Sequence, residues 1–343
     1  MGKLNKRSRA VFPILTALLV ITFFLSLKFG AITISWAEIQ SSFLHWITGG
    51  ESNLNERIFL QIRLPRAFAG VLVGAGLGVG GVLMQALFRN PIVEPGLVGT
   101  SSGAAFGASL YFVLGSVIKF HAGEWTLPIA ACMGGALSTV CVFLLSQNRA
   151  TGKSSVVTLL LMGLAINALF LSGVGFLSYL ARDPQARSII FWNLGTLSGA
   201  NWASISIIGL VTVACTIISL RYAKQLNALM MGEDEAIFLG VNLKRLQIIV
   251  IALNVLLVAV STAFTGVISF VGLVVPHLLR LMGGSDNRFL IMASAIVGGI
   301  LLSLADLVSR LMLAPAELPI GIVTSLVGVP VFIILLRKKQ YYF

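Results

Sequence analysis

The chain has 343 residues, of which 57% are hydrophobic and 10% are charged. A soluble domain carries roughly 25% charged residues, so this composition excludes a soluble fold and indicates a polytopic membrane protein. The net charge of +12 does not indicate nucleic-acid binding, because the basic residues lie between apolar runs and form no stripe. We therefore expect the chain to lie in a lipid bilayer and to bind no nucleic acid.

The first apolar run covers residues 10–29 and follows a basic start. It is long and no small-x-small cleavage site closes it convincingly, so we expect a retained membrane span and not a signal peptide. Residues 32–61 are mixed and amphipathic, with Trp36 and Trp46, and are predicted to lie along the membrane surface.

Nine further spans are predicted, and most reach the roughly twenty residues needed to cross a bilayer. The segment 268–282 is short and contains Pro276. Only helices or closed barrels satisfy backbone groups in lipid, so we expect an all-α polytopic membrane protein of about ten transmembrane helices, forming one domain over residues 1–343. The nine segments are 64–87, 96–116, 127–146, 155–180, 203–222, 245–265, 268–282, 289–312 and 319–337.

Basic residues set the predicted orientation. Ten spans place both termini on one side of the membrane. If that side is cytoplasmic, sixteen of the 24 lysines and arginines lie in cytoplasmic segments, which agrees with the positive-inside rule. Both termini and residues 226–247 are therefore predicted to be cytoplasmic.

Residues 226–247 are the longest polar interruption in the second half of the chain. Residues 227–231 and 234–239 are each predicted to form a short helix, broken by Gly232 and ended by Gly240. Acidic residues at the start of the second helix suit the positive end of its dipole. The segment is either a capped surface helix or a docking element for a soluble partner. Its candidate contact residues are Glu233, Asp234, Glu235, Ala236, Leu239 and Gly240.

Charged residues at span edges are candidate functional residues, since charge in lipid is costly and usually has a role. Arg63 and Arg66 open the second span, where they either act functionally or extend to the membrane interface. Asp306 and Arg310 are four residues apart, so they either pair along a helix or Arg310 points outward.

A Pro-, Gly- and Ser-rich break separates the second and third spans. Irregular backbone at membrane depth is tolerated mainly where it is buried in protein or lines a cavity. The break is therefore a candidate translocation path, with a simple reverse turn as the alternative. Its candidate residues are Gln85, Asn90, Pro91, Gly99, Ser101 and Ser102.

Gly76-x-Gly78-x-x-Gly81 matches a dinucleotide-binding fingerprint. It lies inside an apolar span with no strand before it, so close helix packing is the better interpretation. We find no ATP site, no metal-ligand spacing and no Ser/His/Asp arrangement in the sequence. A membrane enzyme is not supported.

Several blocks of the sequence resemble known transport proteins. The order Glu235-Ala236 and then Leu239-Gly240 resembles the "EAA…G" coupling loop of bacterial ABC importer permeases. The blocks at 63–104, 266–288 and 305–336 resemble the FecCD family of ABC permeases, which import ferric siderophores, haem and vitamin B12. The resemblance covers nearly the whole chain.

The resemblance implies a type II ABC importer permease in a bacterial cytoplasmic membrane. It implies a second permease subunit, in a homodimer or close heterodimer, with the substrate path between the subunits. It further implies two cytoplasmic ATPases bound to residues 226–247 and an external solute-binding protein that meets Arg63, Arg66 and Arg310. ATP and Mg²⁺ would then belong to the ATPase partner, and this chain would bind no cofactor.

The substrate is less defined by the sequence. The segment 191–202 is more similar to haem and cobalamin permeases than to siderophore permeases, although it also fits an interfacial aromatic belt. We expect an iron chelate, with haem favoured over ferric siderophore and with vitamin B12 as the alternative. A stand-alone secondary transporter is the remaining alternative. It predicts paired intramembrane carboxylates, but Glu94 and Asp306 lie at opposite faces.

Overall fold

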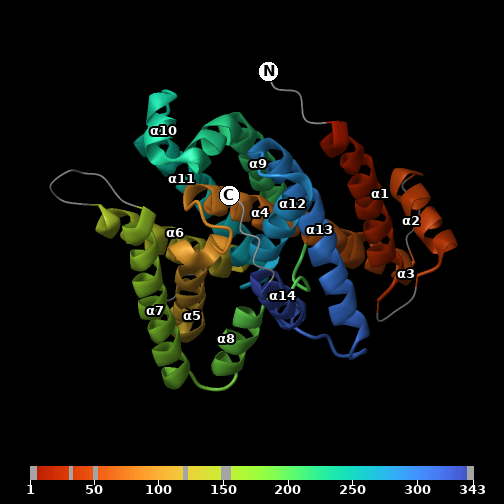
Figure 1. Ribbon diagram of the computed structural model, residues 1–343. Coiled ribbons are helices and arrows are strands. Elements are labelled where there is room, and N and C mark those ends of the chain that lie inside the picture. Colours follow the sequence, from red (N-terminus) through yellow and green to blue (C-terminus); the bar gives the residue numbers. More distant parts are fainter. Residues whose placement is uncertain (1–5, 31–33, 49–52, 119–122, 148–155, 338–343) are drawn as a thin grey trace.

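The computed structural model describes residues 6–30, 34–48, 53–118, 123–147 and 156–337 (Figure 1). These residues form helices joined by turns and short loops. The helices, in order, are α1 (Lys6–Lys28), α2 (Trp36–Thr48), α3 (Leu54–Ile58), α4 (Leu64–Leu87), α5 (Thr100–Ile118), α6 (Thr126–Ser146), α7 (Val156–Leu180), α8 (Gln185–Leu194), α9 (Trp202–Met231), α10 (Glu233–Phe238), α11 (Leu243–Thr265), α12 (Val271–Gly283), α13 (Asn287–Leu311) and α14 (Ile320–Arg337).

The predicted spans agree with the helices. Each of the ten predicted segments coincides with a helix, and seven described helices are long and apolar enough to cross a membrane. Two more apolar helices, α12 and α14, are shorter. The all-helical class is therefore confirmed, while ten crossings stays a prediction. The two chain ends, predicted to be cytoplasmic, lie outside the described residues.

Helix α4 lies at the centre of the fold, with α13 packed along it (Figure 1). In its apolar window 83% of the residues are buried inside the chain. A Cβ on Gly74 would overlap the Gly298 backbone, and one on Gly78 would overlap the Ser294 carbonyl oxygen. Small residues let helix backbones approach this closely in a membrane, so the structure supports helix packing as the role of these α4 glycines.

Irregular backbone reaches the centre of the bundle between α4 and α5. After α4, the chain turns back through a 3₁₀ turn, Pro95–Val98, before α5 begins. Asn254, in the middle of α11 and fully buried, donates a hydrogen bond to the Pro95 carbonyl at 2.9 Å. Because Asn254 lies halfway along a membrane-length helix, Pro95 must lie at that same depth.

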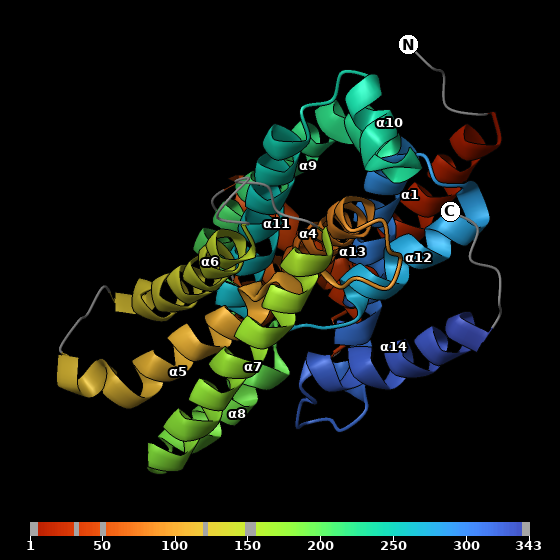
Figure 2. The same cartoon turned by 60° about the vertical axis from the view of Figure 1, so that its left-hand side comes forward.

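The two ends of the bundle carry different features. The α9–α10–α11 corner projects at one end in both Figure 1 and Figure 2. The α7–α8 connection and the loop between α13 and α14 lie at the opposite end (Figure 2). The predicted coupling segment and the predicted outer connections are therefore at opposite ends of the molecule.

Candidate functional sites

The segment 226–247 begins differently from the prediction. Residues 227–231 are not a separate helix but the last turns of α9, which runs unbroken over 30 residues. At about 1.5 Å per residue, α9 is about 45 Å long and exceeds a hydrocarbon core of about 30 Å. The last turns of α9 carry Arg221, Lys224 and Asn227, so we expect the excess length at this end. The predicted break at Gly232 is confirmed, with φ of +149°.

Helix α10 follows, with its three acidic residues in the first turn as predicted. Ala236 is fully buried against the bundle, whereas Ile237, Phe238 and Leu239 are 56%, 93% and 61% exposed. Gly240, at φ +80°, turns the chain towards α11. Exposed apolar side chains grouped in this way are a feature of interaction sites, and the docking role of this segment stays a prediction.

Residues 226–247, the predicted docking segment, are also bonded to the rest of the bundle. Asn227 donates a hydrogen bond to Asp286 at 2.9 Å and accepts one from the Asn287 backbone at 2.8 Å. Arg89, in the turn after α4, lies 3.7 Å from Glu233. The start of α10 and the end of α9 therefore contact both the α12–α13 corner and the end of α4.

The three predicted docking arginines come together at the opposite end. Arg63, Arg66 and Arg310 are only 7%, 7% and 5% exposed. Asp306 lies between two of them: its Oδ1 is 2.9 Å from Arg66 Nη2 and its Oδ2 is 3.0 Å from Arg310 Nε. Arg66 also donates to Glu317 Oε1 at 2.8 Å. Of the two alternatives for Asp306 and Arg310, the structure has the pairing along the helix.

The remaining guanidinium hydrogens reach the end of α1. Arg63 donates to the carbonyl oxygens of Leu27 and Lys28 at 3.0 and 3.1 Å. Arg310 donates to the Ser26 hydroxyl at 2.8 Å. In this structure Arg310 therefore points inward, towards α1 and Asp306. The predicted docking role of the three arginines stays a prediction.

Sequence reasoning missed Glu317. Its side chain is 38% exposed, whereas that of its partner Arg66 is 8% exposed. The sequence shows Glu317 as an acidic residue in the loop before the last span. No sequence spacing relates it to Arg66, which is 251 positions away.

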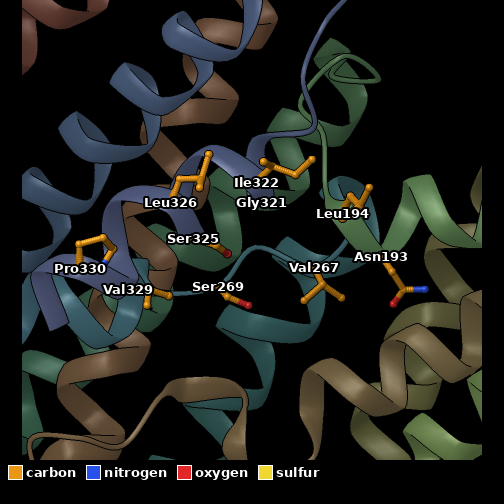
Figure 3. Close-up of a pocket in the computed structure, with 10 residues that line it drawn as sticks. All are labelled: Asn193, Leu194, Val267, Ser269, Gly321, Ile322, Ser325, Leu326, Val329 and Pro330. Atoms are coloured by element: carbon orange, nitrogen blue, oxygen red, sulfur yellow. The ribbon is translucent and has the colours of Figure 1, made fainter. Parts of the chain in front are cut away.

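Two neighbouring cavities lie beside the irregular backbone. One has a volume of about 540 Å³ and is formed by α8, α14 and the turn after α11 (Figure 3). The second, about 370 Å³, extends to the segment after α4. Asn193, Val267 and Ser269 line both cavities, so the two adjoin, and together they are called the cavity tract.

The predicted path residues divide between this tract and the surrounding packing. Ser101 and Ser102 line the second cavity. Gln85 instead donates to the Leu273 carbonyl at 3.1 Å. Asn90 accepts a hydrogen bond in its own turn, and Gly99 packs on α6. Pro91 is buried in the same turn. These four do not line either cavity.

The cavity residues that the sequence did not suggest come from distant segments. Asn193 is on α8, Ser269 follows α11 and Ser325 is on α14 (Figure 3). Glu94 is the charged side chain among the described lining residues. One of its oxygens accepts a hydrogen bond from the Phe270 N–H at 3.0 Å. A cavity at membrane depth, lined by broken helices, is typical of transporter substrate paths.

The long apolar helices, with cavities between them, define a multi-pass helical membrane protein with the build of a transport subunit. The FecCD transport family model matches residues 18–338, and the chain belongs to this family as the permease of an ABC transporter. The chain is 37% identical to the hemin transport system permease HmuU of Yersinia pestis over 97% of both chains. It is 39% identical to the vitamin B12 import permease BtuC of Photorhabdus laumondii, over 96% of this chain and 93% of that one.

A solved structure has the same fold. It is described as an inward-facing conformation of a metal-chelate type ABC transporter, with a TM-score of 0.84 and 33% sequence identity. The match covers 96% of this chain and 99% of that chain. The family resemblance expected from the sequence is thereby confirmed.

Proposed function

We propose that this chain forms the translocation path of an ATP-driven importer for a metal chelate in a bacterial cytoplasmic membrane. The observation that carries the proposal is the arrangement along one axis. A contact surface at α10 lies at one end, a cavity tract lies at membrane depth, and a buried arginine cluster lies at the other end. This order suits alternating access driven from the α10 end.

The partners follow from the two ends. The exposed tip of α10, with Ile237, Phe238 and Leu239, suits the groove of a cytoplasmic ATPase. Two such ATPases would serve a dimer of permease subunits, and ATP and Mg²⁺ would be bound by them. An extracytoplasmic solute-binding protein would dock at the arginine end. The predicted orientation, with α10 cytoplasmic, is part of this proposal.

Helix α7 supports a second permease subunit. In its apolar window only 11% of the residues are buried inside the chain, compared with 83% in α4. It also stands beside the cavity tract, since Asn167 and Leu171 line the second cavity. A partner packed on α7 would close the path on that side, which favours a homodimer or a close heterodimer.

For the substrate we propose an iron chelate, haem or a ferric siderophore, with vitamin B12 as the alternative. Relatives named for hemin and for vitamin B12 are similar to this chain at 37% and 39% identity. The shared property of these ligands is a metal held inside an organic chelate, so the permease needs a wide path and no metal ligands of its own. The two similarities do not separate haem from cobalamin.

The test is recovery of the assembly. The tagged chain is extracted in mild detergent, its partners are identified by mass spectrometry, and the recovered binding protein is titrated with haem, cyanocobalamin and a ferric siderophore. Recovery of an ABC ATPase and a solute-binding protein supports the importer. If neither is recovered, and the purified chain alone moves solute in liposomes, a secondary transporter takes its place.

A further inference from the structure

Helix α12 connects the docking segment with the cavity tract. It is only 13 residues long and packs against α4, α13 and α14. Its first residue, Val271, follows the turn that lines the cavities. Its other end leads into the corner that contacts α9.

At the α9 end, Arg280 is the main contact. Its Nη1 lies 3.4 Å from Met230 Sδ, and its Nη2 lies 3.4 Å from Gln85 Oε1. The following corner is held by Asn227, which bonds to both Asp286 and Asn287. Met230 and Asn227 are in the last two turns of α9, directly before α10. A displacement of α10 would therefore act on the end of α12.

At the cavity end, α12 is preceded by its N-cap Phe270, a non-glycine residue with φ of +69°. A residue with a side chain is strained at positive φ, and this backbone conformation persists only where the surrounding structure holds it. Here the Phe270 N–H donates to Glu94 at 3.0 Å, and the Phe270 ring packs on Gly328 of α14. Ser269, immediately before it, lines both cavities. A shift of this end would change the wall of the tract.

Between its ends, α12 has one close contact and one open side. A Cβ on Gly81 would overlap the Gly272 backbone, so α4 and α12 touch there without intervening side chains. On another side, Val274 and Leu278 line an apolar cavity of about 340 Å³ shared with α13 and α14. Protein interiors are normally close-packed, so this space is the side towards which a tilt of α12 about its contact with α4 meets the fewest atoms.

We propose that α12 is a lever that carries movement of the docking segment to the cavity wall. Arg280 is the positioning residue at its driven end, and the Glu94 contact with the Phe270 N–H holds its cavity end. The inference rests on the proposed function of residues 226–247 as the ATPase-binding segment. It names α12 as the physical connection between residues 226–247 and the cavity tract. Energetic coupling between two sites is carried by packed elements of this kind that have two arrangements.

The experiment uses one cysteine as a reporter of the cavity. Cys132, Cys141 and Cys215 are replaced by serine, and Ser325→Cys places a thiol in the wall of the larger cavity. The complex recovered with its ATPase is reconstituted in nanodiscs. The rate of labelling by a polar maleimide is then measured without nucleotide and with ATP plus vanadate.

Arg280→Gln tests the driven end. We expect it to reduce the nucleotide-dependent change in labelling rate by about 2- to 30-fold, while ATP hydrolysis and assembly are retained. The matched control is Arg288→Gln, which removes the same charge from the same corner. Among the described residues, the Arg288 side chain has no assigned contact with α9, so the control should respond as the reporter alone does.

Substitutions at Glu94 test the cavity end, in case Arg280→Gln does not assemble. Glu94→Ala removes the acceptor of the Phe270 N–H and should raise labelling without nucleotide. Glu94→Gln keeps an oxygen acceptor and should raise it less. If Arg280→Gln responds as fully as the control, or if the two Glu94 variants are alike, the lever is wrong while the coupling role stands. If the labelling rate of the Ser325→Cys protein without further substitutions does not change with nucleotide, the coupling role of residues 226–247 is itself contradicted.

Discussion

The buried carboxylate of Asp306 offers the sharpest test of the arginine cluster. Asp306 is 1% exposed and faces two arginines whose side chains are 8% and 6% exposed. Replacing Asp306 by Asn keeps the shape of the side chain and removes its charge. Arg66 would retain Glu317, and Arg310 would retain backbone carbonyls and Ser26. The guanidinium groups of Arg66 and Arg310 would then both stay buried, and the nearby carboxylate would be that of Glu317, which bonds to Arg66 and is 38% exposed.

The expected loss is large. Removing one partner of a buried ion pair costs about 3–5 kcal/mol, because the charge that remains is still buried. Glu317 is more than one-third exposed, so Glu317→Gln should cost only about 0.2–1 kcal/mol. The two substitutions make the same chemical change, a carboxylate to an amide, on partners of the same arginine. Their difference isolates the effect of burial.

The measurement is reversible unfolding in mixed micelles with increasing SDS, followed by circular dichroism. The free energy of unfolding of Asp306→Asn should fall several times further than that of Glu317→Gln. If the two variants unfold at the same SDS fraction, then Asp306 does not neutralise the cluster, and its buried position must be explained without ion pairing.

Three further predictions concern packing, docking and the chain break. Gly81→Ala should destabilise the bundle by about 1–3 kcal/mol, because its Cβ would overlap the α12 backbone, while Gly175→Ala, with open space around it, should not; SDS unfolding measures both. Aspartate at Phe238 or Leu239 should leave that unfolding free energy within about 0.5 kcal/mol yet reduce ATPase recovery in the pull-down, and full recovery would contradict the docking role. Asn254→Leu leaves a buried carbonyl without its donor, at a cost of about 1–3 kcal/mol, and an unchanged unfolding curve would argue against the packing of the break.

Hydropathy predicted the helices well, because a long apolar run in a bilayer has few alternatives to a helix. The error at residues 227–231 has a local cause. The segment is polar, but it contains no proline or glycine before Gly232, and its Ala, Leu and Met favour helix. Polarity ends a membrane span without ending the helix.

The sites were harder to predict from the sequence, because their contacts are between residues that are far apart in the chain. Asp306 and Arg310 are four positions apart on one helix, and their pairing was predictable. The contact of Arg66 with Glu317 and the convergence of Asn193, Ser269 and Ser325 were not, since no local spacing encodes them. The glycines in α4 indicated close packing, but not which helices would pack there.

The contrast between α4 and α7 bears on how this protein responds to its lipid. Helix α4 is surrounded by protein, so bilayer thickness should have little direct effect on the centre of the fold. Helix α7, 25 residues and about 37 Å long, presents most of its surface outward and must tilt or deform a thinner bilayer, at fractions of a kcal/mol per Å of mismatch. Acyl-chain length should therefore affect the wall of the second cavity, which α7 lines with Asn167 and Leu171, and a second subunit packed on α7 would shield that wall from the lipid.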